Sequence, residues 1–186
     1  MDNTQIKSIG VFMGAKNGGN PEYRKISELV GKKIAEVNKR LVYGGGKEGL
    51  MGAVALSVME NGGSVLGITP QNLAEESMPA DKITELIQVP DMNVRKQLLI
   101  DESDVFIALP GGFGTLEEIS QVISWDKINI IQKPIVLYDI NNFYADFYKW
   151  LQTMETSQFI PAGSMKYIYL SNDIDDIFDY LNNWHI

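Results

Sequence analysis

The chain has 186 residues, of which 45% are apolar, and a formal net charge of −8. This length is enough for one well-filled core and short for two, so we expect a single domain over residues 1–186. The lack of cysteine excludes disulfides and thiolate sites, and the single histidine, His185, excludes a multi-histidine metal cluster. We expect His185 to be chemically inert and catalysis to rest on Asp, Glu, Arg, Lys, Ser, Thr or Tyr.

The negative charge also narrows the choice of partners. Its long-range field repels polyanions, and no basic stripe is visible, so we expect no nucleic-acid partner. The first residues contain no basic segment followed by an apolar one, and no apolar run approaches the roughly 18 residues of a membrane span. The composition therefore predicts a soluble, cytoplasmic protein with no membrane partner.

Apolar runs of strand length alternate with amphipathic stretches of helix length along the chain. The expected strands cover residues 8–14, 40–44, 64–69, 85–90, 104–110, 134–140 and 167–171. The expected helices cover residues 21–38, 49–61, 93–102, 115–129, 143–157 and 174–183. This alternation predicts an α/β fold with a doubly wound, mostly parallel, Rossmann-like sheet and helices on both faces. The irregular stretch 70–82 is long enough to be a lid or the edge of a site.

Three of the expected strands end in glycine-rich loops. These loops are GAKNGGN (14–20), GGGKEGLMG (44–52) and PGGFGT (110–115), and each leads into a helix. In open parallel sheets, ligands bind outside the carboxyl ends of the strands, where helix N-terminal amides also point. Three such loops on one edge predict an anion site, with phosphate as the favoured ligand.

Residues 44–49 satisfy the dinucleotide pattern GxGxxG after a strand and before a helix. That pattern normally follows the first strand and is completed by an acidic residue at the tip of the next strand. Here it follows the second strand, and the next tip reads Ile68-Thr69-Pro70. Two interpretations remain open: the glycines form a dinucleotide site, or they only permit close packing of the strand against the helix.

Thr115 and Glu118 can be explained in two ways. In the first, they form a T-x-x-E capping box, in which Thr115 caps the helix and Glu118 reaches back to its amide. In the second, Glu118 faces a ligand in the glycine turn, because it lies on the helix face that looks back at Gly114. Glu117 is rotated by about 100° from that face. A carboxylate beside phosphate would be repelled, so Glu118 would meet an uncharged, hydroxyl-bearing part of the ligand.

Arg95 and Lys96 lie in the first turn of an expected helix, where the macrodipole disfavours cations. They are either tolerated surface charges or a local cluster that holds an anion in an acidic protein. Arg95 is the better candidate for a ligand contact, because its planar fork binds phosphate or carboxylate bidentately and stays charged.

Taken together, VYGGGKEGLMG (42–52), MNVRK (92–96) and PGGFGTLEE (110–118) resemble the LOG ("lonely guy") family of cytokinin riboside 5′-monophosphate phosphoribohydrolases. The resemblance runs from about residue 8 to residue 160. It departs from the family pattern at Asn93, where a histidine is usual, and at Met13, where a cysteine or serine is usual. The family has also been labelled lysine decarboxylase, but no lysine here is singled out for the pyridoxal chemistry that this label needs.

The resemblance implies hydrolysis of the N-glycosidic bond of a purine ribonucleoside 5′-monophosphate, with N6-prenyl adenine as a candidate base, and no metal or cofactor. It assigns catalysis to Arg95 and Glu118. It assigns substrate or phosphate binding to Gly111, Gly112, Gly114, Thr115, Gly45, Gly46, Met92 and Lys96. It also implies a homodimer, in agreement with the excess of apolar residues in ISQVISW and FYADFYKW.

Two other functions remain open from the residues alone. A non-catalytic carrier of a nucleotide or phosphorylated cofactor could use the same glycine loops, because a fold does not fix a function. An NAD-dependent oxidoreductase is supported only by the GxGxxG match.

Overall fold

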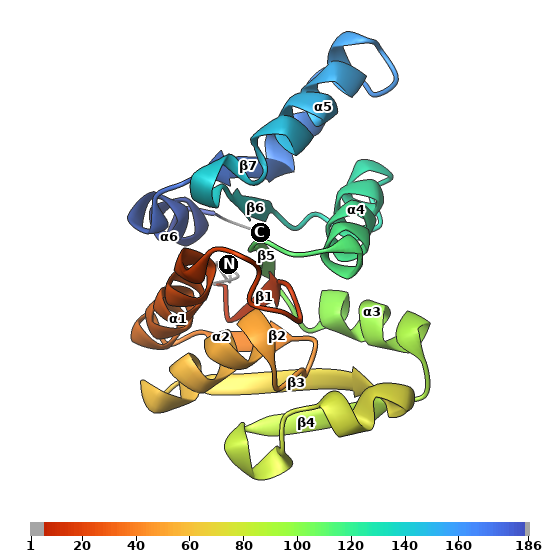
Figure 1. The fold of residues 1–186 in the computed structure, drawn as a ribbon. Helices are drawn as coiled ribbons and strands as arrows, with labels where there is room; N and C mark the ends of the chain where they lie inside the picture. The colour runs from red at the N-terminus through yellow and green to blue at the C-terminus, as the bar shows by residue number, and fades with distance from the viewer. Residues whose placement is uncertain (1–5, 185–186) are drawn as a thin grey trace, which may run out of the picture.

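The computed structural model describes residues 6–184, and its centre is one seven-stranded sheet (Figure 1). All six strand pairings are parallel, in the order β4-β3-β2-β1-β5-β6-β7. The strands are β1 (Ser8–Phe12), β2 (Arg40–Tyr43), β3 (Ser64–Pro70), β4 (Glu85–Val89), β5 (Val105–Ala108), β6 (Ile135–Tyr138) and β7 (Ile168–Ser171). The predicted α/β fold with a parallel sheet is confirmed.

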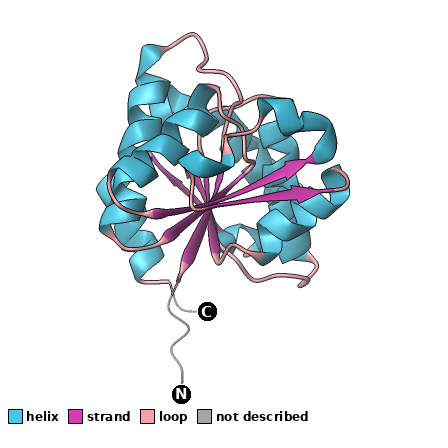
Figure 2. Cartoon of the chain, turned by 90° about the horizontal axis from the view of Figure 1, so that it is seen from below, coloured by secondary structure: helices cyan, strands magenta, loops and turns pink. Residues whose placement is uncertain are grey.

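Six α-helices cover the two faces of this sheet (Figures 1 and 2). They are α1 (Pro21–Glu36), α2 (Gly49–Glu60), α3 (Met92–Asp101), α4 (Phe113–Lys127), α5 (Ala145–Thr156) and α6 (Ile174–Asn182). One core cluster contains apolar residues of α1, α2 and α6, and a second contains those of α3, α4 and α5. Short 3-10 helices cover η1 (Gln71–Glu76), η2 (Ala80–Lys82), η3 (Ile140–Asn142) and η4 (Ser164–Tyr167).

Local sequence explains these elements. Successive strand residues point to opposite faces, so Leu41 and Tyr43 join one core cluster and Val42 joins the other. Helix α3 begins one residue earlier than expected, and Asp91 is its N-cap. The Asp91 Oδ1 atom accepts hydrogen bonds from the backbone N–H groups of Asn93 and Val94, at 2.8 and 3.0 Å.

The strand order reverses between β1 and β5, and the glycine-rich loops meet at this point. The Gly14 N–H donates to the Pro110 carbonyl at 3.0 Å, which joins the loop after β1 to the loop after β5. The Leu50 N–H, at the start of α2, donates to the Gly14 carbonyl at 3.2 Å. The three loops therefore lie on one edge of the sheet, where open parallel sheets bind ligands.

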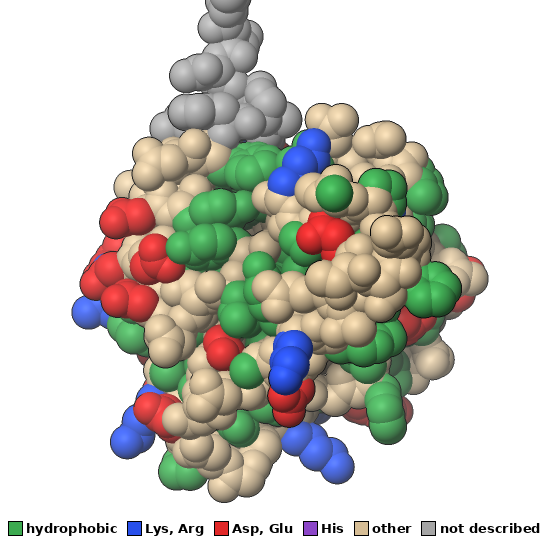
Figure 3. All heavy atoms as spheres, turned by 90° about the horizontal axis from the view of Figure 1, so that it is seen from above, with side chains coloured by type: hydrophobic (Ala, Val, Ile, Leu, Met, Phe, Trp, Pro, Cys, Tyr) green, Lys and Arg blue, Asp and Glu red, His purple; other side chains and the backbone are tan. Residues whose placement is uncertain are grey.

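Within residues 6–184, no helix combines the length and the apolar character that crossing a bilayer requires. Figure 3 shows a face on which Lys and Arg side chains are scattered and form no continuous basic patch. His185, which we expect to be inert, lies outside the described residues.

Candidate functional site

A buried ion pair joins α3 to α4 beside the glycine-rich edge. The Arg95 Nη1 atom lies 3.1 Å from Glu118 Oε1, and the two residues are only 6% and 8% exposed. Arg95 Nε also donates to the Ile68 carbonyl at 3.0 Å, and Nη2 donates to the Gly44 carbonyl at 3.2 Å. A guanidinium carries five N–H groups, so two remain for a ligand, one on each terminal nitrogen.

Gly44 is needed for this arrangement. A Cβ atom at position 44 would overlap Arg95 Nη2 and lie close to Met51. The absence of a side chain lets the guanidinium approach the backbone at the end of β2. The glycine at position 44 thus has a steric role beside Arg95.

The capping-box reading of Thr115 and Glu118 is wrong. Helix α4 begins at Phe113, its N-cap is Gly112, and no side chain caps it. Thr115 is therefore the third residue of the helix, and the Glu118 carboxylate binds Arg95 instead of a backbone amide. A buried charge-assisted hydrogen bond is stronger than a bond to a neutral backbone amide, which explains why Glu118 binds Arg95 and does not cap the helix. Burial raises the pKa of Glu118, and the Arg95 guanidinium opposes this rise.

The glycine turn presents open backbone at the start of α4. The first helical bond here runs from the Leu116 N–H to the Gly112 carbonyl, so the amides of residues 113–115 precede it. Side chains built at Gly112 or Gly114 would meet nothing within 4 Å, so a ligand can approach the backbone closely. A helix N-terminus with open amides is suited to an anion.

The carbonyls before the turn are held from two sides. The buried Tyr144 hydroxyl donates to the Leu109 carbonyl at 2.7 Å, and the Gly14 N–H donates to the Pro110 carbonyl at 3.0 Å. Both hydrogen bonds fix the peptide groups that lead into the turn. The turn is therefore tied to α5 and to the loop after β1.

Three neighbouring cavities surround these groups. The first, which we call the Arg95 cavity, has a volume of about 330 Å³ and is lined by Ala15, Gly44, Gly46, Lys47, Glu48, Met51, Thr69, Leu73, Glu75, Glu76, Ser77 and Arg95. The second, of about 410 Å³, lies between residues 14–18 and 110–112 and shares Ala15 with the first. The third, of about 340 Å³, is mainly apolar and includes Thr115 and Phe147. The second and third share Gly111, Gly112 and Phe143.

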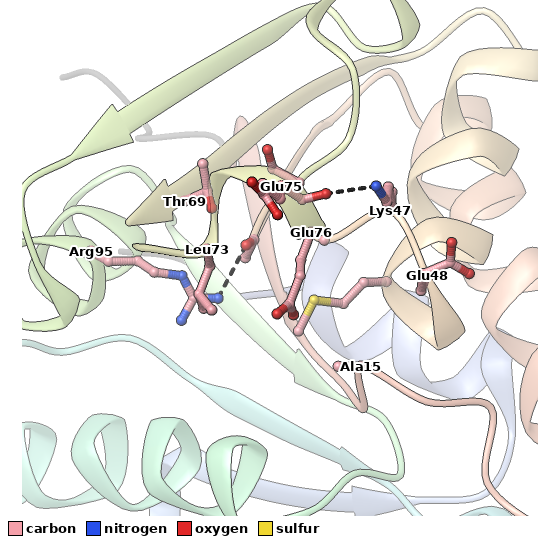
Figure 4. Close-up of a pocket in the computed structure, with 12 residues that line it drawn as sticks. Ala15, Lys47, Glu48, Thr69, Leu73, Glu75, Glu76 and Arg95 are labelled. Atoms are coloured by element: carbon pink, nitrogen blue, oxygen red, sulfur yellow. Dashed lines mark hydrogen bonds between the residues drawn. The ribbon is translucent and has the colours of Figure 1, made fainter. Parts of the chain in front are cut away.

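Segment 70–82 forms one wall of the Arg95 cavity (Figure 4). The Lys47 N–H donates to the Glu76 carbonyl at 3.0 Å, and the Met78 N–H donates to the Gly45 carbonyl at 2.7 Å. Some backbone groups of the loop after β2 are therefore already hydrogen-bonded to segment 70–82. These hydrogen bonds occupy backbone groups that a dinucleotide would need, and the tip of β3 has no acidic residue. Both observations count against dinucleotide binding at residues 44–49.

Of the other predicted binding residues, some line the Arg95 cavity and some do not. Gly46 lines the Arg95 cavity, whereas Gly45 has a φ of 75° and supplies the carbonyl that accepts from Met78. Lys96 Nζ lies 2.6 Å from Glu117 Oε1, in a second link between α3 and α4. Neither Lys96 nor Met92, which is 37% exposed, lines any of the three cavities.

Sequence reasoning missed Glu76, which lines the Arg95 cavity from an expected loop. No motif marks this residue, and its position depends on backbone bonds to residues 45–47. The only signal in the sequence was the length of stretch 70–82, which suggested the edge of a site.

The comparisons with known sequences give consistent results. A family model described as "Possible lysine decarboxylase" matches residues 51–181. The cytokinin riboside 5′-monophosphate phosphoribohydrolase of Rhodococcoides fascians is 36% identical over 170 residues, which cover 91% of this chain and 86% of the relative. The enzyme of the same name, LOG7, from Arabidopsis thaliana is 33% identical over 181 residues, which cover 97% and 83%.

Solved structures show the same fold at lower identity. The molybdenum cofactor binding protein of Rippkaea orientalis has a TM-score of 0.73 at 22% identity and covers 96% of both chains. The Moco carrier protein of Chlamydomonas reinhardtii has a TM-score of 0.73 at 19% identity and covers 95% of this chain and 96% of its own. These structures support the fold alone, and the sequence matches decide the family. The chain belongs to the LOG family of cytokinin riboside 5′-monophosphate phosphoribohydrolases.

Proposed function

We propose that this protein is a nucleoside 5′-monophosphate phosphoribohydrolase. It hydrolyses the N-glycosidic bond of purine ribonucleoside 5′-monophosphates, with N6-prenyl adenine nucleotides among the candidate substrates, and releases the free base and ribose 5-phosphate. The observation that carries this proposal is the buried Arg95–Glu118 pair, which lies between the open glycine turn and the Arg95 cavity. We also propose that residues 1–186 act as one nucleotide-binding unit and that the protein is a homodimer.

The glycine turn is the proposed phosphate anchor. The amides of residues 113–115 and the Thr115 hydroxyl are donors, and phosphate oxygens are acceptors. Gly112 and Gly114 leave room for close approach of the ligand, whereas the missing side chain of Gly111 makes room for the Thr115 side chain. A phosphate bound here fixes the far end of the substrate, so its binding energy contributes to the positioning of the sugar.

Glu118 and Arg95 are the proposed catalytic groups. Cleavage of a ribosyl–purine bond passes through a ribosyl cation, and a nearby carboxylate stabilises that charge, binds ribose hydroxyls or orients the attacking water. Arg95 holds the carboxylate at 3.1 Å and keeps two N–H groups for the substrate. These donors suit a ribose oxygen or the departing base.

Product analysis tests the proposal against its alternatives. The purified protein is incubated with AMP or adenosine, and adenine is quantified by chromatography. We expect adenine from AMP and almost none from adenosine. Equal kcat/KM for the two would contradict the phosphate anchor. Unchanged AMP with measurable binding would favour a nucleotide or phosphorylated-cofactor carrier, and binding of NAD alone would favour an oxidoreductase.

A further inference from the structure

The Arg95 cavity is poorly suited to a phosphate group. Three carboxylates line it, from Glu48, Glu75 and Glu76, against the two cations of Lys47 and Arg95. Both cations are already engaged. Lys47 Nζ donates to the Glu75 carbonyl at 2.6 Å, and the Arg95 charge is balanced by Glu118. A phosphate dianion here would meet uncompensated negative charge, whereas the glycine turn offers open amides.

The same cavity is suited to a flat heterocycle. Met51 and Leu73 supply apolar surface among its polar lining residues. Its volume of about 330 Å³ is at the lower end of the usual range for small-molecule sites, about 300–1,000 Å³. The cavity is therefore large enough for a single base and has apolar groups to pack against its ring.

The position of Arg95 relates the cavity to the scissile bond. Arg95 lines this cavity, whereas Glu118 lines a fourth, much smaller pocket that has no room for a ligand. Ala15 joins it to the second cavity, which reaches Gly111 and Gly112 of the glycine turn. A nucleotide with its phosphate at the turn and its sugar beside Arg95 would direct its base into the Arg95 cavity.

Glu76 is the polar group best placed to form a hydrogen bond with that base. In Figure 4 its side chain extends from η1 into the pocket, toward the side where Arg95 and Ala15 lie. Its backbone carbonyl is fixed by the Lys47 N–H at 3.0 Å. Within residues 6–184, its carboxylate forms no hydrogen bond or ion pair. An ionised carboxylate only accepts hydrogen bonds, so its partner in the ligand must be an N–H or O–H donor.

We propose that the Arg95 cavity holds the base and that Glu76 accepts a hydrogen bond from the exocyclic amino group of an aminopurine. Glu76 is then a specificity-determining residue of the reaction, and this inference rests on the proposed function. An amino group with one substituent still has one N–H, so N6-substituted adenine also satisfies Glu76. Glu76 is exposed in the structure, and a base without this donor would displace water from its carboxylate without replacing the lost hydrogen bond.

The test compares AMP with purine riboside 5′-monophosphate, which lacks only the amino group. The ratio of kcat/KM for the two substrates is measured in the wild type, Glu76→Ala, Glu76→Asp and Asp81→Asn. Asp81 lies on the same segment, is exposed and lines none of the three cavities, so Asp81→Asn is the charge-matched control. Comparing the ratio between variants cancels the different reactivities of the two leaving bases.

We expect Glu76→Ala to lower the preference for AMP about tenfold, the scale of one hydrogen bond to a charged group, and Glu76→Asp to lower it as well. Asp81→Asn should keep the wild-type ratio. A wild-type ratio in folded Glu76→Ala, which has no acceptor, overturns the proposal. If the wild type cleaves neither nucleotide, the same ratio of Kd values, measured by calorimetry, still tests the base contact separately from the proposed reaction.

Discussion

Glu118 is a buried carboxylate whose charge is balanced by one neighbour, the Arg95 guanidinium. Removing one member of such a pair leaves an uncompensated charge, which costs about 3–5 kcal/mol of stability. Truncation of either residue would therefore lower stability and activity together. An isosteric change that keeps a hydrogen-bond acceptor separates the two effects better.

We predict that Glu118→Gln lowers turnover of AMP by roughly 10² or more, the scale of electrostatic and acid–base catalysis. The glutamine carbonyl can still accept from Arg95, so the melting temperature should fall far less than for Glu118→Ala. Steady-state kinetics and thermal unfolding measure both quantities. Glu117→Gln, on the exposed face of the same helix, is the matched control and should retain activity. A folded Glu118→Gln protein with wild-type turnover would remove Glu118 from the mechanism.

Gly44→Ala tests the positioning of Arg95 without changing a charge. The added methyl group would overlap Arg95 Nη2, so the guanidinium must shift from its three acceptors. Because misplacement by about 1 Å can cost 10²-fold in rate, we expect kcat to fall at least tenfold. The control is Gly19→Ala, since a Cβ there meets nothing within 4 Å. Equal kcat values for the two variants would show that Arg95 does not need its observed position.

At the level of elements, local patterns predicted the helices and strands well and their long-range contacts poorly. The seven strands and six helices follow from alternating apolar runs, with ends that differ by a few residues. The T-x-x-E pattern left a cap at Thr115 as one of two explanations, but the partner of Glu118 is Arg95, which lies 23 positions away in the sequence. The sequence left Arg95 as either a tolerated surface charge or a ligand contact, and its burial depends on carbonyls 27 and 51 positions away. Such contacts leave no local signature.

The last turn of α4 contains a second buried acid, Asp126, which is 8% exposed. Its Oδ1 atom accepts from the Lys133 N–H at 3.2 Å, and this bond ties the helix end to the chain before β6. Burial raises the pKa of Asp126 from 3.8 to about 6, while the Lys133 N–H and the Lys166 charge oppose the rise. Compared with the unfolded chain, the folded state therefore stabilises the protonated form of Asp126 relative to the ionised form.

This shift predicts a pH-dependent effect of Asp126→Asn. A raised folded-state pKa gives stability that is present below pH 3.8 and is lost as the pH rises through about 6. Asparagine keeps the Oδ1 acceptor and cannot ionise. We expect the variant to melt at a higher temperature than the wild type at pH 8, and the difference to vanish near pH 4. A difference in melting temperature that is constant between pH 4 and 8 would contradict this account.

At the scale of the whole molecule, the strand order places the site. The reversal between β1 and β5 brings residues 14–18 beside residues 110–112, and β2, next to β1, adds the loop with Gly44. The glycine-rich strand ends predicted the edge of the sheet on which the site lies. The strand order itself and the wall formed by segment 70–82 depend on tertiary contacts that the sequence pattern does not encode.

The surface supports the proposed homodimer. Large apolar side chains are exposed on and beside α4 and α5, where the sequence has an excess of apolar residues, and they include Phe113, Leu116, Phe143 and Trp150. Trp150 is 57% exposed, and aromatic side chains are common at the centres of protein interfaces. An exposed apolar surface of this kind is typical of a binding face.

We predict that light scattering at micromolar concentration gives twice the chain mass of 20.8 kDa. Trp150→Glu should shift the protein toward the monomer, because a charge buried in an apolar interface without a partner is unfavourable. Gln152→Glu adds the same charge at an exposed position on the same helix, rotated by about 200° from Trp150, and should leave the dimer intact. A wild-type mass of 20.8 kDa would refute the homodimer. A dimer that is unaffected by Trp150→Glu would instead place its interface away from this part of α5.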